Sequence, residues 1–488
     1  MIRLLTLADG LALAAQAFVG LAYLLSSLWE KEKRASLFAA LQFVGMLLVF
    51  ILFVSMALSG YFQTWFGGTL LISGTLGAAA GGFFLVRRTG FNAKALQGPD
   101  GYVSGSVERV DERTVVFARN RLVPGTKEFD AFYNEYPQFK EKDDKRRQKG
   151  SVLGTYGCID APNEKPNVSA MVALRYFGAH MARPDIVRPE QGPFFKGFKA
   201  ELSPAEATER VKGFARHLGA ALVGVAKLDP KWVYSKIGCI YKENWDHGDA
   251  DWSIWGNDIN LDRHPYVIVF AEEMDRELIA ASPHTPVFVE SMTNYAKGAF
   301  ISTQLAAYIA NLGYSATANH VQHYELILPP IAAAAGLGEV GRLGYLMTKE
   351  YGPRIRLSAV TTNMPLVPDK PVDIGAEHFC TICKKCATTC PSRSIPEDDG
   401  RKEFNGTMRW KLDAESCFAY WGNVGTDCGI CMRVCPWSHA RTWPHRIIVW
   451  LISRNKYMRI LFSRMDDLFY GRKPKPADAP RWAAFRKK

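Results

Sequence analysis

The chain has 488 residues, of which 48% are hydrophobic and 22% are charged, so its average composition is that of an ordinary globular protein. This length is enough for two or three structural units. Lysine and arginine (60) outnumber aspartate and glutamate (48), which gives a net charge of +12. We expect no nucleic-acid partner, because the apolar N-terminal region makes an anionic membrane surface the simpler explanation for the basic excess.

Three long apolar runs lie near the N-terminus, at about residues 11–28, 37–58 and 69–86. Each is close to the ~20 residues that a helix needs to cross the hydrocarbon core of a bilayer. Gly77 and Gly81 are four residues apart, a spacing that allows helices to pack closely in lipid. We therefore predict a three-helix transmembrane anchor over residues 1–88, rather than a buried helical core or a cleavable signal peptide.

Basic residues are distributed unevenly around these runs. They follow the first and third runs, at Lys31, Lys33, Arg34, Arg87, Arg88 and Lys94. The connection between the second and third runs, residues 59–68, contains neither lysine nor arginine. Because basic loops stay on the cytoplasmic side, we predict a multi-pass protein of the cytoplasmic (inner) membrane whose catalytic domain faces the cytoplasm. No pair of arginines precedes the first run, so no twin-arginine export signal is expected.

The soluble part begins with residues 89–200, which we predict to be a segment that wraps the core. Its charge run over residues 140–150 is typical of a solvated surface, and residues 168–200 indicate irregular structure. Residues 201–375 follow an α/β pattern. This pattern consists of a capped helix beginning at Ser203, a long helix over 287–312, a short helix over 331–335, and strands over 222–226, 266–271 and 355–362.

A glycine-rich loop follows the short helix and contains Gly336, Gly338, Gly341 and Gly344. No strand directly precedes it, and neither G-x-G-x2-G nor G-x4-G-K-[ST] is present, so it does not match a nucleotide-phosphate loop. We predict instead that its backbone approaches another large, flat cofactor. Cys158 and Cys239 stand alone in the sequence, and we interpret them as structural.

The other eight of the ten cysteines lie between Cys380 and Trp437. The first four read C-x2-C-x2-C-x3-C-P, the spacing by which bacterial-type ferredoxins bind [4Fe–4S] clusters, with the fourth cysteine ligating the other cluster. Zinc sites and disulfides are the alternative explanations of this spacing. A zinc site would leave the fourth cysteine unexplained, and disulfides would require an oxidising compartment. We assign one cluster to Cys380, Cys383, Cys386 and Cys435, and the other to Cys390, Cys417, Cys428 and Cys431. The expected ferredoxin-like domain covers residues 376–440, and residues 441–488 form a C-terminal tail.

Several further blocks accompany the double cysteine motif. They are Asn294–Ala296, Leu305–Ile309, Leu312–Tyr314, Ala335–Glu339 with Arg342 and Gly344, Tyr351–Leu357, and Asp467–Gly471. Together these blocks resemble the reductive dehalogenase family, whose enzymes use a corrinoid and iron–sulfur clusters to remove halogen from organohalides. The resemblance covers about residues 111–470. Epoxyqueuosine reductase, a relative of that family, has the same pair of cofactors and a similar core.

The resemblance implies a nitroreductase-like core, residues 201–375, that binds a base-off corrinoid (cobalamin), with the glycine-rich loop among its contacts. Tyr295 matches the family's proton donor and Arg342 its basic residue. A cation near a phenol would ease loss of the phenolic proton. The family often has an asparagine between these positions. Asn319 is offset from the expected place, so His320 and His323 are alternatives.

The function that the resemblance implies is that of a membrane-anchored reductive dehalogenase, an oxidoreductase. Two clusters would reduce the corrinoid to Co(I), which attacks the halogen of an organohalide or transfers an electron to it. Two alternatives remain open: a tRNA-modifying enzyme like epoxyqueuosine reductase, and a membrane iron–sulfur electron-transfer subunit without corrinoid. The electron donor that we expect is a membrane quinol or a soluble ferredoxin or flavodoxin, and the sequence leaves this choice open.

Overall fold

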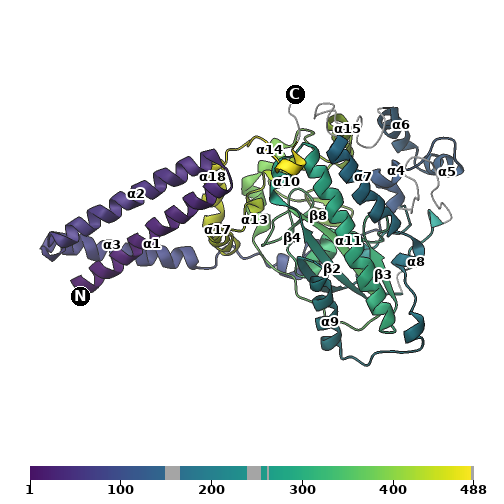
Figure 1. Cartoon of the computed structure of the whole chain (residues 1–488), viewed down its shortest axis with the longest axis horizontal. Coiled ribbons are helices and arrows are strands. Elements are labelled where there is room, and N and C mark those ends of the chain that lie inside the picture. The colour runs from purple at the N-terminus through teal and green to yellow at the C-terminus, as the bar shows by residue number, and fades with distance from the viewer. Residues whose placement is uncertain (149–164, 239–253, 261–262, 485–488) are drawn as a thin grey trace. The chain divides into compact units, whose positions relative to one another are not determined.

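The computed structural model describes residues 1–148, 165–238, 254–260 and 263–484 (Figure 1). Cys158 and Cys239 lie outside these residues. The chain divides into two compact units. The first consists of Met1–Phe91 and His439–Pro474, and the second consists of Asn92–Ser438 and Lys475–Lys488. The first unit therefore combines the N-terminal segment that contains the predicted anchor with a segment from near the C-terminus.

Three long apolar helices form most of the first unit: α1 (Ile2–Trp29), α2 (Lys33–Leu58) and α3 (Trp65–Val86). All three are long and apolar enough to cross a membrane. Large apolar side chains on them are exposed, for example Leu48 (61%) and Leu52 (62%), as a lipid-facing surface requires. The three predicted helices are confirmed, and each is longer than its apolar run.

The contact between α1 and α2 depends on a glycine that the sequence pattern did not single out. A Cβ at Gly20 would lie 3.3 Å from Cα of Phe43, so the two backbones approach closely there. At Gly77 and Gly81, by contrast, an added Cβ would meet nothing within 4 Å among the described residues. The prediction that Gly77 and Gly81 allow close helix packing is therefore wrong within this unit.

Two helices near the C-terminus complete the first unit: α17 (Trp443–Arg454) and α18 (Lys456–Phe469). Helix α17 contacts α1 and α3, and α18 contacts α2. Asn455 caps α18 and donates a hydrogen bond to the Phe84 carbonyl at the end of α3 (2.7 Å). Residues 441–488 are thus not a plain tail, because most of them pack on the predicted anchor.

A four-stranded sheet organises the second unit. Its strands are β1 (Leu222–Lys227), β2 (Tyr266–Glu273), β3 (Ala316–Asn319) and β6 (Ile355–Thr362), in the spatial order β1-β2-β6-β3. All neighbouring strands are antiparallel. The three predicted strands are confirmed, whereas β3 was not predicted, because it is only four residues long and contains no large apolar side chain.

Helices cover both faces of this sheet. On one face, α9 (Pro204–His217) and α11 (Thr285–Asn311) pack on an apolar cluster that includes Ile268 and Phe270. On the other face, α12 (Leu328–Ala334) packs on Val267 and Val269 of the same strand. Strand β2 is therefore buried on both sides, which explains its unbroken apolar run. The predicted capped start at Ser203 is confirmed as a capping box with Glu206 that begins α9, and the α/β pattern is confirmed.

Residues 92–200 contain more helix than the sequence indicated. The helices are α4 (Val116–Arg119), α5 (Lys127–Glu135), α6 (Lys140–Gln148), α7 (Lys165–His180) and α8 (Pro184–Val187). Helix α7 packs along α11, so the expectation of irregular structure over residues 168–200 is wrong for that stretch. Short 3₁₀ helices occur at Ala95–Tyr102, Glu112–Thr114, Pro137–Phe139 and Pro193–Phe195.

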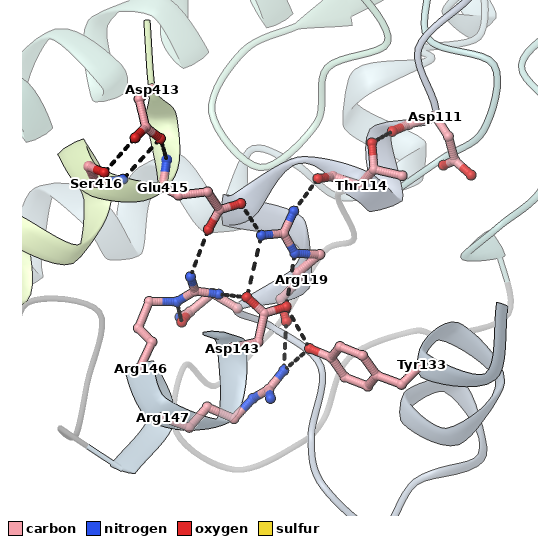
Figure 2. Close-up of polar contacts among 11 residues, drawn as sticks. Asp111, Thr114, Arg119, Tyr133, Asp143, Arg146, Arg147, Asp413, Glu415 and Ser416 are labelled. Carbon is pink, nitrogen blue, oxygen red and sulfur yellow. Dashed lines mark hydrogen bonds and ion pairs between the residues drawn. The ribbon is translucent and has the colours of Figure 1, made fainter. Parts of the chain in front are cut away.

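The predicted solvated charge run is in part a buried ion-pair network (Figure 2). Arg119 and Asp143 are almost fully buried and form an ion pair of 2.9 Å. Arg119 also pairs with Glu415, and Arg146 pairs with Glu415 at 3.3 Å. The network ties α4 and α6 to α15 (Ala414–Val424), which carries Cys417. Residues 140–148 therefore support the cysteine-rich region, and only one side of α6 is solvated.

The remaining elements are short. They are α10 (Arg276–Ala280), β4 (Glu339–Val340), β5 (Leu346–Met347), α13 (Ala376–Cys383), α14 (Lys385–Thr389), β7 (Lys402–Phe404), β8 (Thr407–Arg409) and α16 (Ile430–Arg433), with 3₁₀ helices at Tyr61–Gln63, Pro230–Trp232, Pro436–Ser438 and Arg481–Ala483. Helices α13 to α16 carry the cysteine motifs or lie directly beside their cysteines.

Candidate active site and cysteine centres

The eight cysteines of the second unit are gathered into two groups of four. The thiol of Cys435 interacts electrostatically with those of Cys380, Cys383 and Cys386, which form the first cysteine group. The second cysteine group, Cys390, Cys417, Cys428 and Cys431, lines a single cavity. The fourth cysteine of each sequence motif has crossed into the other group, which is the arrangement that the spacing predicts.

Burial makes these thiols poor metal ligands unless positive charge is added. It raises the pKa of Cys417 to about 11 and that of Cys428 to about 12. It also raises the pKa of Cys431 and of Cys435 well above the usual value for a thiol. The irons of a cluster would supply the charge that converts such thiols to thiolates. Two sets of four thiols, the first buried and the second partly buried, therefore fit two [4Fe–4S] clusters.

The loop that carries Cys428 depends on a glycine for its position. Gly429 has φ = +69°, and a Cβ there would lie 2.6 Å from Cγ2 of Val287 and 2.7 Å from Oγ of Ser282. The loop is therefore pressed against the start of α11, and no other residue type fits without displacing one of these neighbours. Tyr295 lies two turns later on the same helix, so α11 contacts the loop of the second cysteine group and also carries Tyr295.

Tyr295 lies beside an arginine that the sequence interpretation did not single out. The guanidinium carbon of Arg356, on β6, is 5.2 Å from the centroid of the Tyr295 ring. Arg356 also lines the cavity of the second cysteine group. Burial alone would lower the pKa of Arg356, but Tyr295, Asp427 and Tyr345 together raise it, so the guanidinium stays charged. A cation–π contact of this kind places a fixed positive charge next to the phenol.

Ser291 and Asp427 hold this arginine in place. Arg356 Nη2 donates a hydrogen bond to Ser291 Oγ (2.8 Å) and lies 3.4 Å from Asp427 Oδ2. Ser291 Oγ in turn donates to Asp427 Oδ2. Because Ser291 and Tyr295 are four residues apart on α11, they face the same side of the helix. The carboxylate of Asp427, directly before Cys428, thus connects the second cysteine group to the tyrosine through Arg356.

Arg342, the predicted basic residue, occupies a different place. It is fully buried, and its Nε donates to the Cys380 carbonyl (3.0 Å). Its Nη1 donates to the carbonyls of Pro396 (2.6 Å) and Asp398 (2.7 Å). The guanidinium also lies over the ring of Trp410. These contacts brace the loops around the first cysteine group, and they do not bring Arg342 to Tyr295.

Asn319, His320 and His323 are the polar candidates that lie between Tyr295 and Arg342 in sequence. Asn319 is the last residue of β3, and the two histidines follow it. Asn319 Oδ1 accepts from the Glu325 amide (2.8 Å) and its Nδ2 donates to the Thr317 carbonyl (3.2 Å), so its side chain closes the local turn. Burial lowers the pKa of His320 and of His323 to about 3, so both rings are neutral. Nε2 of His323 has no hydrogen-bond partner among the described residues, which leaves this atom free for a ligand.

The glycine-rich loop packs against the protein itself. A Cβ at Gly336 would lie 2.5 Å from the Lys370 carbonyl oxygen, and one at Gly338 would lie 2.0 Å from that of Met347. At Gly341 it would lie 2.5 Å from Cγ of Met347, whereas at Gly344 it would have ordinary contacts only. Close approach to neighbouring backbone explains Gly336 and Gly338 without a cofactor, so the loop's predicted corrinoid contacts gain no support from its packing.

Sequence reasoning thus missed Arg356, Ser291 and Asp427. Two signals could have indicated them: the four-residue spacing of Ser291 and Tyr295 on a predicted helix, and the position of Asp427 next to a cluster cysteine. Arg356 alternates with apolar residues in a predicted strand, which indicates a polar group facing one side of the sheet. Only the pairing of β6 with β2 and its packing on α11 showed which side that is.

Comparison with known proteins shows what these features are similar to. A family model described as a 4Fe-4S dicluster domain matches residues 379–439. A tetrachloroethene reductive dehalogenase from Sulfurospirillum multivorans is 36% identical over 295 residues, which are 55% of this chain and 58% of that protein. One from Desulfitobacterium hafniense is 33% identical over 61% of this chain and 59% of its own length. The chain thus spans a little under three fifths of these relatives.

A solved structure agrees with the sequence matches. A catabolic reductive dehalogenase, in an N-terminally tagged variant, aligns over 80% of this chain and 49% of its own, with 25% identity and a TM-score of 0.60. An epoxyqueuosine reductase from Lactococcus garvieae is 34% identical, but over only 22% of this chain. The fold, the dicluster domain and these relatives together show that the chain is a homologue of the reductive dehalogenases, a family of oxidoreductases.

Proposed function

We propose that this protein is a membrane-anchored, corrinoid-dependent reductive dehalogenase that replaces a carbon–halogen bond of an organohalide with a carbon–hydrogen bond. The reaction consumes two electrons and one proton and releases a halide ion. The observation that carries the proposal is that Tyr295 and Arg356 stand next to the cavity of the second cysteine group. A proton donor and an electron source would therefore meet at one place in the second unit.

The two cysteine groups would hold the two [4Fe–4S] clusters. The first is buried and braced by Arg342, and the second is adjacent to Arg356. The clusters supply one-electron transfer when bound. Arg356, through Asp427, connects the second group to the tyrosine, so we assign the second group as the one that delivers electrons to the reacting centre.

A corrinoid is compatible with polar atoms that the protein leaves unsatisfied at Asn294, next to Tyr295 in sequence, and at Arg356 and Asp427. Among the described residues, Asn294 Oδ1, Asp427 Oδ1 and Arg356 Nε are buried and have no hydrogen-bond partner. Orphaned groups of this kind cost free energy unless a ligand satisfies them, and a corrin carries amide groups on its rim. When bound, the corrinoid supplies the low-valent cobalt that breaks the carbon–halogen bond. We propose that these atoms, in a nitroreductase-like core, help to hold it.

Tyr295 would donate the proton to carbon. A phenol is a weak acid, and the guanidinium next to its ring stabilises the phenolate that remains after transfer. The ion pair with Asp427 and the hydrogen bond to Ser291 fix the guanidinium, so its charge does not need to reorganise during the reaction. Arg356 thus takes the role that the sequence assigned to Arg342.

Three apolar helices and the basic residues beside them support a membrane location with the second unit in the cytoplasm. Such an enzyme would receive electrons from a membrane quinol or from a soluble ferredoxin or flavodoxin. The substrate would belong to the organohalides. Relatives are named for tetrachloroethene, and one solved homologue was bound to 3-bromo-4-hydroxybenzoic acid, so chlorinated ethenes and halogenated phenols are the first candidates.

The test is metal analysis and halide release with the full chain, purified without oxygen in detergent. We expect about eight irons and about one cobalt per chain, and halide release from at least one organohalide class with a strong chemical reductant. Eight irons without cobalt, and no halide release, would identify an iron–sulfur electron-transfer subunit and overturn the proposal. Restoration of queuosine in a strain lacking epoxyqueuosine reductase would instead support the tRNA-modifying alternative.

A further inference from the structure

The first unit contains a group of metal-ligating side chains that is separate from the cysteines. Glu30 is the residue that follows α1, His439 precedes α17, and His445 lies in the first turn of α17. One ligand atom from each lies within 4.8 Å of the other two. These three residues come from opposite ends of the sequence, so only folding of the unit brings them together.

The geometry of this group is close to that of a metal site. Nδ1 of His445 is 3.6 Å from Oε1 of Glu30. In a tetrahedral site with bonds of about 2.0–2.2 Å, ligand atoms are about 3.4 Å apart. The side chain of Glu30 is fully buried, and those of His445 and His439 are 7% and 22% exposed. The site is thus enclosed, apart from one edge at His439.

Outer partners orient both imidazoles. Nε2 of His439 hydrogen bonds to Asp466 Oδ1 (2.5 Å), and Nε2 of His445 to the Tyr470 hydroxyl (3.0 Å). Nδ1 of His445 is then the ring atom that faces Glu30. A ligating histidine typically donates its second ring N–H to a carboxylate or another acceptor in this way. The pairing of His439 with Asp466 is therefore the arrangement that a metal ligand needs.

Two hydroxyl groups complete the surroundings. Ser26 Oγ donates to Glu30 Oε1 (3.0 Å), and Thr442 Oγ1 lies 2.8 Å from Nδ1 of His445. The two hydroxyls are also within 2.8 Å of each other. They lie between the carboxylate and the imidazole, where they could remain as neighbours of a bound ion or give way to it. The competing explanation for the cluster is that no ion binds and that Glu30, Ser26, Thr442 and His445 form a chain of hydrogen bonds.

We propose that Glu30, His439 and His445 bind one divalent transition-metal ion of the zinc type, for which imidazole and carboxylate are suitable ligands. The ion would join the end of α1 to the start of α17. It would stabilise the first unit by closing a very long stretch of chain, independently of the reaction in the second unit.

The test uses zinc with the full chain in detergent, after removal of loosely bound metal by a chelator and with the iron content checked. We expect about one zinc per chain to remain through gel filtration, and the melting temperature of the first unit to rise with zinc. His439→Gln and His445→Gln should each weaken zinc binding at least tenfold, and Asp466→Asn about 10–100-fold. His180→Gln, which removes an exposed histidine of the second unit, is the matched control.

Loss of zinc binding in both histidine variants, with iron content and gel-filtration behaviour unchanged, supports the site. The proposal is overturned if the unaltered chain retains no zinc, or if His439→Gln and His445→Gln retain as much as His180→Gln. Because zinc binding by the unaltered chain is measured directly, misfolding of one variant does not decide the question.

Discussion

The guanidinium carbon of Arg356 lies 5.2 Å from the centre of the Tyr295 ring, and the same arginine is paired with Asp427, the residue directly before Cys428. A helix, a strand and a cysteine-bearing loop thus meet at one largely buried cation. This relationship places the proposed proton donor next to the proposed electron source, and it defines which residues should affect proton transfer alone.

Replacing Tyr295 with phenylalanine removes the only acidic proton of that side chain and keeps its ring. We expect at least a hundredfold loss of halide release, the size usual for loss of a general acid. Iron and cobalt contents should not change, because the ring still packs against Arg356. Steady-state assays alongside metal analysis check this. Activity within a few-fold of the unaltered enzyme would show that another group donates the proton.

Arg356→Gln and Arg342→Gln should fail in different ways. Arg356→Gln should lower turnover strongly with both clusters retained, and Arg356→Lys should recover part of the loss because it keeps a positive charge. Arg342→Gln should instead lower the iron content, because Arg342 holds the carbonyls of Cys380, Pro396 and Asp398. Iron analysis with turnover numbers distinguishes the two. If Arg342→Gln lowered turnover with full iron content, and Arg356→Gln lowered the iron content, Arg342 would be the catalytic cation.

The crossing of cysteines between motifs can be tested with pairs of serine substitutions. Cys386→Ser combined with Cys435→Ser should damage one cluster only and leave about four irons per chain, since each cubane holds four. Cys386→Ser combined with Cys417→Ser should damage both. Electron paramagnetic resonance of the reduced protein reports which cluster remains. Equal iron loss in the two double variants would contradict the grouping.

The buried network of Arg119 and Asp143 should stabilise the second unit locally. Asp143→Asn leaves Arg119 without its buried partner, and we expect the free energy of opening of α4 and α6 to fall by about 3–5 kcal/mol. Hydrogen–deuterium exchange of residues 116–148 measures this. Glu141→Gln is the matched control, because the pair of Glu141 with Lys145 is exposed and should contribute nothing measurable. Equal effects of the two substitutions would mean that the network is not stabilising.

The predicted topology can be tested with single cysteines introduced into the connections of the anchor. Ser59→Cys should react with a membrane-impermeant maleimide added to intact cells, because residues 59–68 are predicted to lie outside. Lys33→Cys should react only after the cells are opened. The parent chain measures background labelling of the native cysteines. Labelling of Lys33→Cys alone in intact cells would reverse the orientation.

Local patterns were sufficient for some elements. The apolar runs predicted α1, α2 and α3, the Ser203–Glu206 box predicted the start of α9, and the cysteine spacing predicted which thiols would be grouped. Each of these depends on residues near one another in sequence or on a fixed coordination chemistry. Helix α7 and strand β3 were not predicted, because their stability comes from packing on α11 and β6 rather than from their own composition.

The sequence by itself therefore determined the chemistry of this protein: apolar spans, eight cysteines in two ferredoxin-like motifs, and Tyr295 on a long helix. Only the tertiary structure decided which charges act together. In the folded chain, Arg342 contacts the cysteine loops, and Arg356 contacts Tyr295. Asp143 is buried although it belongs to a charge run, and Glu30 lies close to His439 and His445. The reason is physical. A local pattern fixes which side of an element a residue faces, but long-range packing fixes what it meets there.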